Sequence, residues 1–300
     1  MAKRKRLPAL PEEVSELDIV IPVYGRPDLL KECLAAIPLA GFDVNYKLFL
    51  VDDKSPEPGP LEILYNSLNS QARIIRNPQN MGFPAAANRG AAQGHAPAIL
   101  FLNSDVVLKP NALRIMLNSL WSSQIERGIF DPPDIKGVGI VAPKLLFPEG
   151  GHDQNRPGGK VQHVGIAFNG AGKPFHALIG WSSDNPKVNI KRSLQAVSGA
   201  CLLIRRALFD QIWRGYQAVG DPSAGGFNEV YGLGTYEDIE LSFAVRSLGY
   251  QVLVEPRAVG YHYVGGSAAA QPGGYPLGRN ENIFRARCGQ LILWDEWAVW

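Results

Sequence analysis

Short strands that are apolar on both faces alternate with helical stretches along the first half of this chain. In chain order, the predicted strands and helices are Leu17–Val23, Asp28–Ile37, Lys47–Val51, Gly59–Leu68, Arg73–Arg76, Ala85–Gln93, Ala98–Leu102 and Asn111–Trp121. Strands buried on both faces and separated by helices are typical of a parallel sheet with right-handed crossovers. The pattern therefore predicts an α/β fold with a mostly parallel central sheet flanked by helices.

The second half of the chain is less regular. Strands are predicted at Val138–Val141, Val161–Phe168, Gln195–Ile204 and Tyr250–Glu255, and an amphipathic helix at Glu237–Leu248. Between them, Gly215–Gly234 contains six glycines together with Phe227 and Tyr231. This composition predicts a mobile loop, either an ordinary exposed loop or a lid whose aromatic rings offer flat faces to an acceptor.

Neither an internal repeat nor a clear linker divides the chain. We expect one domain over residues 16–290, preceded by a basic tail (1–15) and followed by a Trp-rich segment (291–300). Apolar residues make up 46% of the 300 residues, which is enough for a sizeable core. No apolar run approaches the ~20 residues of a bilayer-spanning helix, and no apolar stretch follows the charged N-terminus. We therefore expect a soluble, cytoplasmic chain, with peripheral attachment to a membrane left open.

The net charge of +2 conceals an asymmetry, because Lys3–Arg6 is entirely basic and the rest of the chain is slightly negative. A nearly neutral body is not typical of a dedicated nucleic-acid-binding protein. The tail is either a solvated end or a contact for phosphate or an anionic membrane surface. Cys33, Cys201 and Cys288 are far apart and form no CxxC pair, so neither a zinc site nor a disulfide framework is predicted.

Polar residues follow three of the predicted strands, at the point where each strand ends. They are Pro22–Arg26, the pair Asp52 and Asp53, and Asn103–Asp105. Ligands of open parallel sheets bind beyond the carboxyl ends of the strands. Any one of these segments alone would be explained by a turn or a helix N-cap, but three such segments at strand ends indicate a site. No GxGxxG follows the first strand and no GxxxxGK[ST] occurs, so neither a classical dinucleotide site nor a P-loop is predicted.

Two further segments carry candidate functional residues. Glu237 and Asp238 open the amphipathic helix, where the helix dipole alone would also favour them. Adjacent carboxylates point in different directions on a helix, so the scaffold can hold one while the other faces a ligand. His262 follows the next strand, where it is either a structural histidine or a metal ligand.

The chain resembles the family 2 glycosyltransferases, which have the GT-A fold, over about Leu17–Gly289. The matching segments, in order, are IVIPVYGR, LVDDKS, RNPQNMGFPAAANRG, FLNSD, VSGACLLIRR, YEDIELSFAVRSLGY, HYVGGS and NIFRARCG. The resemblance implies a nucleotide-binding first half and an acceptor-binding second half.

The resemblance also implies roles for individual residues. Asn103–Asp105 is similar to the family's DXD motif with its first acid replaced by Asn, which makes Asp105 the expected Mn²⁺ or Mg²⁺ ligand. His262 lies where many relatives supply a further metal ligand. Asp238 aligns with the catalytic base, and Glu237 is expected to position the acceptor or to support the metal. The residues implied to bind the donor are Pro22, Tyr24, Arg26, Asp53, Gly82, Asn88, Arg89, Asn103 and Ser104.

The expected activity is a metal-dependent, inverting transfer of a sugar from a UDP- or dTDP-linked donor to an acceptor hydroxyl. A bacterial-type glycan or a lipid-linked saccharide is the expected acceptor, and the NMGFPAAANRG segment most resembles relatives that include rhamnosyltransferases. Two alternatives remain at this point. One is transfer to hydroxymethylated bases of viral DNA, and the other is a non-catalytic module that binds nucleotide sugars.

Overall fold

A computed structural model describes residues 16–41, 43–68, 71–124, 127–129, 131–149, 158–218, 226–263 and 274–295. The basic tail 1–15 and the end of the Trp-rich segment, 296–300, lie outside the described residues. Within the described part of the segment, buried Asp295 accepts a hydrogen bond from the amide of Phe168 at 2.6 Å, so this part packs against its own chain.

The first half follows the predicted alternation closely. Its elements are β1 (Glu16–Val23), α1 (Pro27–Ala40), β2 (Asn45–Asp52), α2 (Pro58–Ser67), β3 (Ala72–Arg76), α3 (Phe83–Ala91), β4 (Ala98–Leu102), β5 (Val106–Leu108) and α4 (Ala112–Leu120). Pro27 occupies the first position of α1, where its fixed φ suits a helix and no backbone donor is lost.

The second half adds short strands and three helices. Its elements are β6 (Gly137–Leu146), β7 (Val161–His163), β8 (Ile166–Phe168), β9 (Pro174–His176), β10 (Arg192–Ser193), β11 (Cys201–Arg205), α5 (Arg206–Ala218), α6 (Glu237–Ser247), β12 (Tyr250–His262) and α7 (Leu277–Cys288), with short 3₁₀ turns between some of them. The helices α5 and α7 were not predicted, and the predicted strand at Gln195–Ile204 begins only at Cys201.

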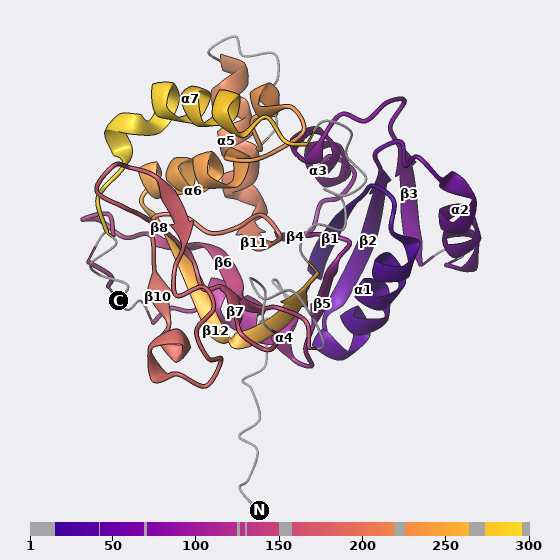
Figure 1. The fold of residues 1–300 in the computed structure, drawn as a ribbon, viewed down its shortest axis with the longest axis horizontal. Coiled ribbons are helices and arrows are strands. Elements are labelled where there is room, and N and C mark those ends of the chain that lie inside the picture. The colour runs from indigo at the N-terminus through magenta and orange to yellow at the C-terminus, as the bar shows by residue number, and fades with distance from the viewer. Residues whose placement is uncertain are drawn as a thin grey trace, which may run out of the picture.

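One large sheet joins the two halves of the chain (Figure 1). Its strand order is β10-β12-β6-β11-β4-β1-β2-β3. Strands β4, β1, β2 and β3 run parallel, as do β6 and β12, whereas β11 is antiparallel to both of its neighbours. The mostly parallel central sheet is thereby confirmed, with β11 as the strand that links its two parallel parts.

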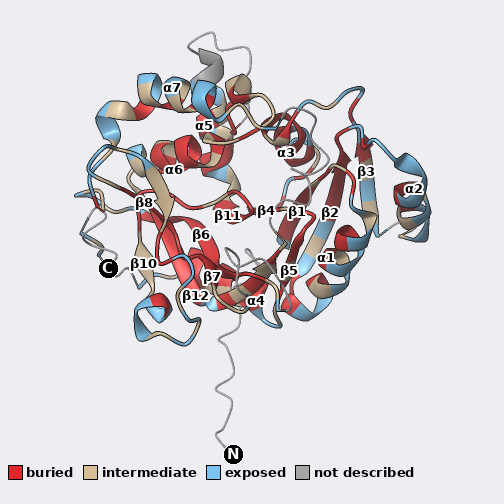
Figure 2. Ribbon diagram, viewed as in Figure 1, coloured by how far each residue is buried: buried red, intermediate tan, exposed pale blue. Residues whose placement is uncertain are grey.

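Helices cover both faces of this sheet, which explains why its strands are apolar throughout. Ile19 and Ile21 of β1 pack into one core with α1 and α4, and Val20 between them packs into a second core with α3, α5 and α6. Figure 2 shows the buried strands in the middle and the exposed surfaces of α2 and α7 at the periphery.

The structure differs from the predicted mobile loop at Gly215–Gly234 in the part that it describes. It begins inside α5, and residues 219–225 lie outside the described part of the chain. Phe227 and Tyr231 are both fully buried, so the prediction that their rings face an acceptor is wrong. Phe227 instead packs edge-on against Phe101 of β4, with ring centroids 4.8 Å apart.

Candidate active site

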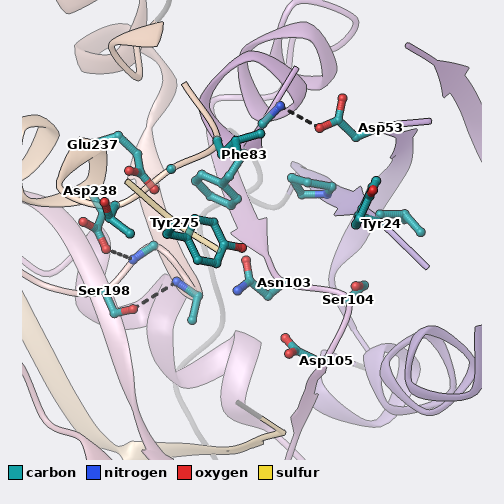
Figure 3. A pocket seen from close by; sticks show the side chains of 18 of the residues that line it. Tyr24, Asp53, Phe83, Asn103, Ser104, Asp105, Ser198, Glu237, Asp238 and Tyr275 are labelled. Atoms are coloured by element: carbon teal, nitrogen blue, oxygen red, sulfur yellow. Dashed lines mark hydrogen bonds between the residues drawn. The ribbon is translucent and has the colours of Figure 1, made fainter. Parts of the chain in front are cut away.

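A cavity of about 430 Å³ lies at the carboxyl ends of β1, β2 and β4, where α6 and the end of β12 meet them (Figure 3). Most of the predicted site residues line it, namely Pro22, Tyr24, Asp53, Gly82, Asn103, Ser104, Asp105, Glu237, Asp238 and His262. Lining residues that the sequence analysis missed include Asn80, Phe83, Ser198, Gly199, Leu233, Gly234, Thr235 and Tyr275. The structure therefore brings Asp105, Asp238 and His262 to one cavity.

Asp105 and His262 are brought together by a short antiparallel ladder. Asp105 immediately precedes β5, and Val106 of β5 pairs with His262 at the end of β12. Nε2 of His262 lies 3.3 Å from Oδ1 of Asp105, and both side chains are about nine-tenths buried. Strand pairing thus fixes an imidazole and a carboxylate side by side at the cavity wall.

The partner of His262 determines which ring nitrogen faces Asp105. Nδ1 of His262 lies 3.2 Å from Oε1 of buried Gln162, an oxygen that can only accept a hydrogen bond. Nδ1 therefore carries a proton, and Nε2 is the ring nitrogen that faces the Asp105 carboxylate. Such an outer partner orients many metal-binding histidines. Gln162 carries no motif signal in the sequence.

The Asp105–His262 pair suits a divalent cation. Oδ1 of Asp105 is buried and makes no hydrogen bond, and Nε2 of His262 faces it. A cation between the two groups would satisfy both, and carboxylate and imidazole ligands are typical of Mn²⁺ and related ions. Among the described residues, no cluster of three or more His, Cys, Asp or Glu side chains is placed to hold a metal, so further ligands would have to come from bound substrate or water.

Glu237 and Asp238 lie across the cavity from Asp105, at the first turn of α6 (Figure 3). Asp238 accepts hydrogen bonds from the amides of Gly199 and Ile239, both at 2.8 Å. Burial raises the pKa of Asp238, and these two amides partly offset the rise. The Asp238 carboxylate is thus held in place by the backbone while it lines the cavity.

Glu237 has a less favourable environment than its neighbour. Its side chain is buried, and its Oε2 has no hydrogen-bond partner. Burial is the main cause that raises the pKa of Glu237 well above its ordinary value, and the adjacent Asp238 carboxylate is the second. A protonated Glu237 can donate a hydrogen bond to a ligand oxygen in the cavity.

The turn that precedes this pair is strained and is held by α7. Thr235 and Tyr236 have φ values of 82° and 74°, which are unusual for residues other than glycine. Nδ2 of fully buried Asn280 donates to the carbonyl of Gly234 at 2.7 Å and to the carbonyl of Tyr231 at 2.9 Å. Helix α7, which was not predicted, therefore supports the backbone that presents Glu237 and Asp238.

Asp53 lines the cavity, and its carboxylate holds the loop before α3. It accepts hydrogen bonds from Nδ2 of Asn77 at 2.7 Å, the amide of Met81 at 2.9 Å and the amide of Gly82 at 2.8 Å. Burial raises the pKa of Asp53, while the three donors act in the opposite direction. Asp53 consequently shapes the wall that carries Asn80 and Phe83.

Three residues expected at the donor site lie outside the cavity lining. Arg26 forms a surface ion pair with Asp28 at 2.7 Å. Arg89 donates to the carbonyl of Arg76 at 3.0 Å. Asn88 is buried, and its Nδ2 donates to the carbonyl of Phe227 at 2.8 Å. Helix α3 turns the side chains of Asn88 and Arg89 toward its supporting segments rather than into the cavity lining.

Part of this chain, including the first segments of the site, is similar to known proteins. Residues 18–122 match the family model described as glycosyl transferase family 2. An O-antigen biosynthesis protein, RfbC, of Myxococcus xanthus is 26% identical over 85% of this chain and 18% of its own length. An N-acetylglucosaminyl-diphospho-decaprenol L-rhamnosyltransferase of Mycobacterium tuberculosis is 22% identical over 95% of this chain and 86% of its own length.

The fold has counterparts among solved structures. The crystal structure of GalNAc-T7 with UDP, GalNAc and Mn²⁺ superposes with a TM-score of 0.58 at 14% identity, over 84% of this chain and 44% of that one.

Two of the relatives found by sequence, RfbC among them, are much longer proteins. This chain spans about a quarter or less of the length of each.

Proposed function

We propose that this chain, which belongs to glycosyl transferase family 2 and has the GT-A fold, transfers a sugar from a nucleoside-diphosphate donor to an acceptor hydroxyl. One observation carries the proposal. A carboxylate–imidazole pair suited to a cation and a second carboxylate held by backbone amides face the same cavity, although Asp105 is distant in sequence from both Asp238 and His262. Sugar transfer requires these two kinds of group on opposite sides of the anomeric carbon.

Asp105 and His262 would hold Mn²⁺ or Mg²⁺. When bound, such a cation stabilises the negative charge that develops on the departing diphosphate. The imidazole ligand favours Mn²⁺ over Mg²⁺, which prefers oxygen ligands. The orientation of His262 by Gln162 would keep its Nε2 available to the ion.

Asp238 would act as the general base. An acceptor hydroxyl is too weakly acidic to ionise at neutral pH, and a carboxylate within hydrogen-bond reach can remove its proton during attack. The amides of Gly199 and Ile239 favour the ionised form of Asp238, as this role requires. Attack from the face opposite the diphosphate inverts the anomeric centre. Protonated Glu237 would donate a hydrogen bond that positions the acceptor.

The donor would lie along the other cavity wall. Pro22, Tyr24 and Asp53 would contact the nucleoside, and Gly82, Asn103 and Ser104 would line the path to the diphosphate. Asn88 and Arg89 would support this wall from behind. We assign no donor contact to Arg26, whose guanidinium is paired at the surface.

The acceptor would be a hydroxyl of a bacterial-type glycan or of a lipid-linked saccharide. The names of the O-antigen and rhamnosyltransferase relatives support this class. Within the described ranges, none of the helices combines the length and apolar character needed to cross a bilayer.

Thermal unfolding in the presence of ligands tests the proposal without knowledge of the acceptor. UDP, dTDP and GDP are each added with and without Mn²⁺. A ligand at about 100 times its Kd stabilises the folded state by about 2.7 kcal/mol, so a binding nucleotide produces a clear rise in Tm. We expect one nucleotide to stabilise the chain, and to do so far more strongly with Mn²⁺.

Two variants separate donor binding from transfer. Asp105→Asn should abolish the Mn²⁺-dependent part of the stabilisation. Asp238→Asn should retain the stabilisation, and should lower transfer from the matching nucleotide sugar by about 10²–10⁴-fold. Asp184→Asn, at an exposed position, is the control for loss of a carboxylate. Wild-type turnover by Asp238→Asn would refute the role of Asp238, and no stabilisation by any nucleotide would refute the proposed donor class.

A further inference from the structure

Two histidines that no sequence motif singles out lie behind the wall of the cavity. His163 ends β7 and is fully buried, and His176 ends β9. Their Nδ1 atoms are 3.0 Å apart, and their rings meet edge to face with centroids 5.2 Å apart. The two strands thus deliver one pair of imidazoles to the interior next to Ser198.

The backbone determines how this pair shares its protons. The amide of Ser198 donates to Nε2 of His163 at 3.3 Å, so this nitrogen carries no proton. The neutral ring of His163 then bears its proton on Nδ1 and donates it to Nδ1 of His176. Burial lowers the pKa of both histidines, that of His176 to about 4, which keeps both rings neutral near pH 7.

Ser198, whose amide donates to His163, is the first residue of a turn, Ser198–Ala200. This turn contacts both sides of the site. The amide of Gly199 donates to Oδ2 of Asp238 at 2.8 Å. The carbonyl of Ala200 accepts from the amide of Asn103 at 2.8 Å. A Cβ on Gly199 would lie 3.2 Å from the Cβ of Asp238, so the turn and the carboxylate pack closely together. Displacement of this turn would move Asp238 relative to Asn103 and Asp105.

We propose that His163, oriented by His176, is a positioning residue that holds the Ser198–Ala200 turn and thereby the Asp238 carboxylate. The proposal rests on the proposed function only for the effect on transfer, because Asp238 is the general base in that function. The hydrogen-bond series from His176 through His163 to Ser198 ends one residue before the amide that holds Asp238. An apolar residue at position 163 would leave the partly buried Ser198 amide without this acceptor, at a cost that favours movement of the turn.

Amide hydrogen exchange in the intact chain tests the proposal without any substrate. The protein is labelled with ¹⁵N-serine and ¹⁵N-glycine, and exchange at Ser198 and Gly199 is followed by NMR. In His163→Leu we expect both amides to exchange about tenfold faster or more, because one hydrogen bond that closes the turn is lost. In His163→Gln, whose Oε1 can accept from Ser198, the rates should return toward wild type. His95→Leu, at an exposed position, is the control.

A second readout follows Asp238 itself. Its carboxyl carbon is titrated by ¹³C NMR in a Glu237→Gln background, which removes the neighbouring titrating group. The amide of Gly199 lowers the pKa of Asp238, so weakening that contact in His163→Leu should raise this pKa. His163→Gln should show a smaller rise, and His95→Leu none. A purely structural role of His163 would lower Tm without this selective change at Asp238.

Each variant has a result that would overturn the proposal. Unchanged exchange at Ser198 and Gly199, together with an unchanged titration of Asp238, in folded His163→Leu would refute it. If His163→Leu does not fold, His176→Leu is used instead, because it removes only the orienting partner. Unchanged amide exchange and an unchanged Asp238 titration in His176→Leu would then refute the proposal. Wild-type transfer by Asp238→Asn would instead refute the base role, and the exchange rates would still decide whether His163 holds the turn.

Discussion

At the scale of single residues, the cavity places its two neighbouring carboxyl groups in different environments. Asp238 accepts two backbone hydrogen bonds, whereas Oε2 of Glu237 has no partner and is buried beside the Asp238 carboxylate. Two amides therefore oppose the rise in the pKa of Asp238, whereas burial and the adjacent carboxylate raise the pKa of Glu237 well above its ordinary value. Such a division suits a base beside a hydrogen-bond donor.

This division predicts a pH-dependent gain in stability for Glu237→Gln. The folded state raises the pKa of Glu237 above the ordinary value of 4.5, so it binds this proton more tightly than the unfolded chain does. The wild-type contribution is fully present below about pH 4.5 and is lost as the pH rises through the folded value. The Tm of the variant should therefore match wild type near pH 4 and exceed it at pH 8, by about 2–4 °C for each kcal/mol removed.

Thermal unfolding monitored by circular dichroism from pH 4 to pH 8 checks this prediction. Glu57→Gln, which removes an exposed carboxylate, is the matched control. A Glu237→Gln variant that is less stable than wild type at pH 8 would show that the buried carboxyl is stabilised in a way that the structure does not reveal.

At the scale of elements, the start of α3 is locked against the turn at Gly232 and Leu233. Gly82 has φ 88°, and a Cβ there would lie 2.2 Å from the carbonyl oxygen of Gly232. The amide of Phe83 donates to the carbonyl of Leu233 at 3.2 Å. The close approach is possible only because residue 82 has no side chain, and it joins the cavity wall at Gly82 and Phe83 to the segment that leads into α6.

Gly82→Ala should therefore weaken both the fold and the site. Left-handed backbone costs a residue with a Cβ about 1–2 kcal/mol, and the overlap with the Gly232 carbonyl adds to this. We expect the free energy of unfolding to fall by about 2 kcal/mol or more, with loss of the nucleotide-dependent rise in Tm. Gly278→Ala in the first turn of α7, where a Cβ meets nothing within 4 Å, should be neutral or stabilising by about 0.5–1 kcal/mol. Equal urea midpoints for the two variants would contradict the packing described here.

At the scale of the whole molecule, the sheet makes the two halves of the chain interdependent. Strand β11 of the second half pairs with β4 of the first, and α5 follows β11 without a break. At this junction, Nη2 of Arg206 lies 2.8 Å from Oδ2 of Asp18 on β1, and the Asp18 side chain is almost fully buried. We propose that residues 16–290 fold as one domain, because one continuous sheet contains strands of both halves.

Arg206→Met tests this coupling. The variant leaves the Asp18 carboxylate buried without its cation, which typically costs about 3–5 kcal/mol. We expect this loss in one cooperative transition, with coincident urea curves from far-UV circular dichroism and tryptophan fluorescence. Arg73→Met, at an exposed position, should change stability by about 0.5 kcal/mol or less. Two separate transitions in either variant would argue against a single domain.

Local sequence patterns were sufficient for the elements of the first half and for part of the site. Strands such as β1 and β4 are apolar on both faces because helices cover both sides of the sheet, and this environment is visible in the sequence. Asp53, Asp105 and Asp238 stand directly after a strand or at a helix start, positions that a pattern can mark. The placement of Asp53 and Asp105 at one cavity follows from the rule that parallel strands end at the same edge, because β2 and β4 both run parallel to β1.

Other features depend on contacts between segments that are distant in the chain. The antiparallel direction of β11, the hydrogen bond from Gly199 to Asp238 and the pair His163–His176 leave no periodic signal, because each is set by where another segment packs. The same cause turned Asn88 away from the cavity and buried Phe227 and Tyr231. The sequence by itself determined which residue types stand at the strand ends, since that is local chemistry; the tertiary structure alone decided which of them face one another, since that depends on the packing of the whole sheet.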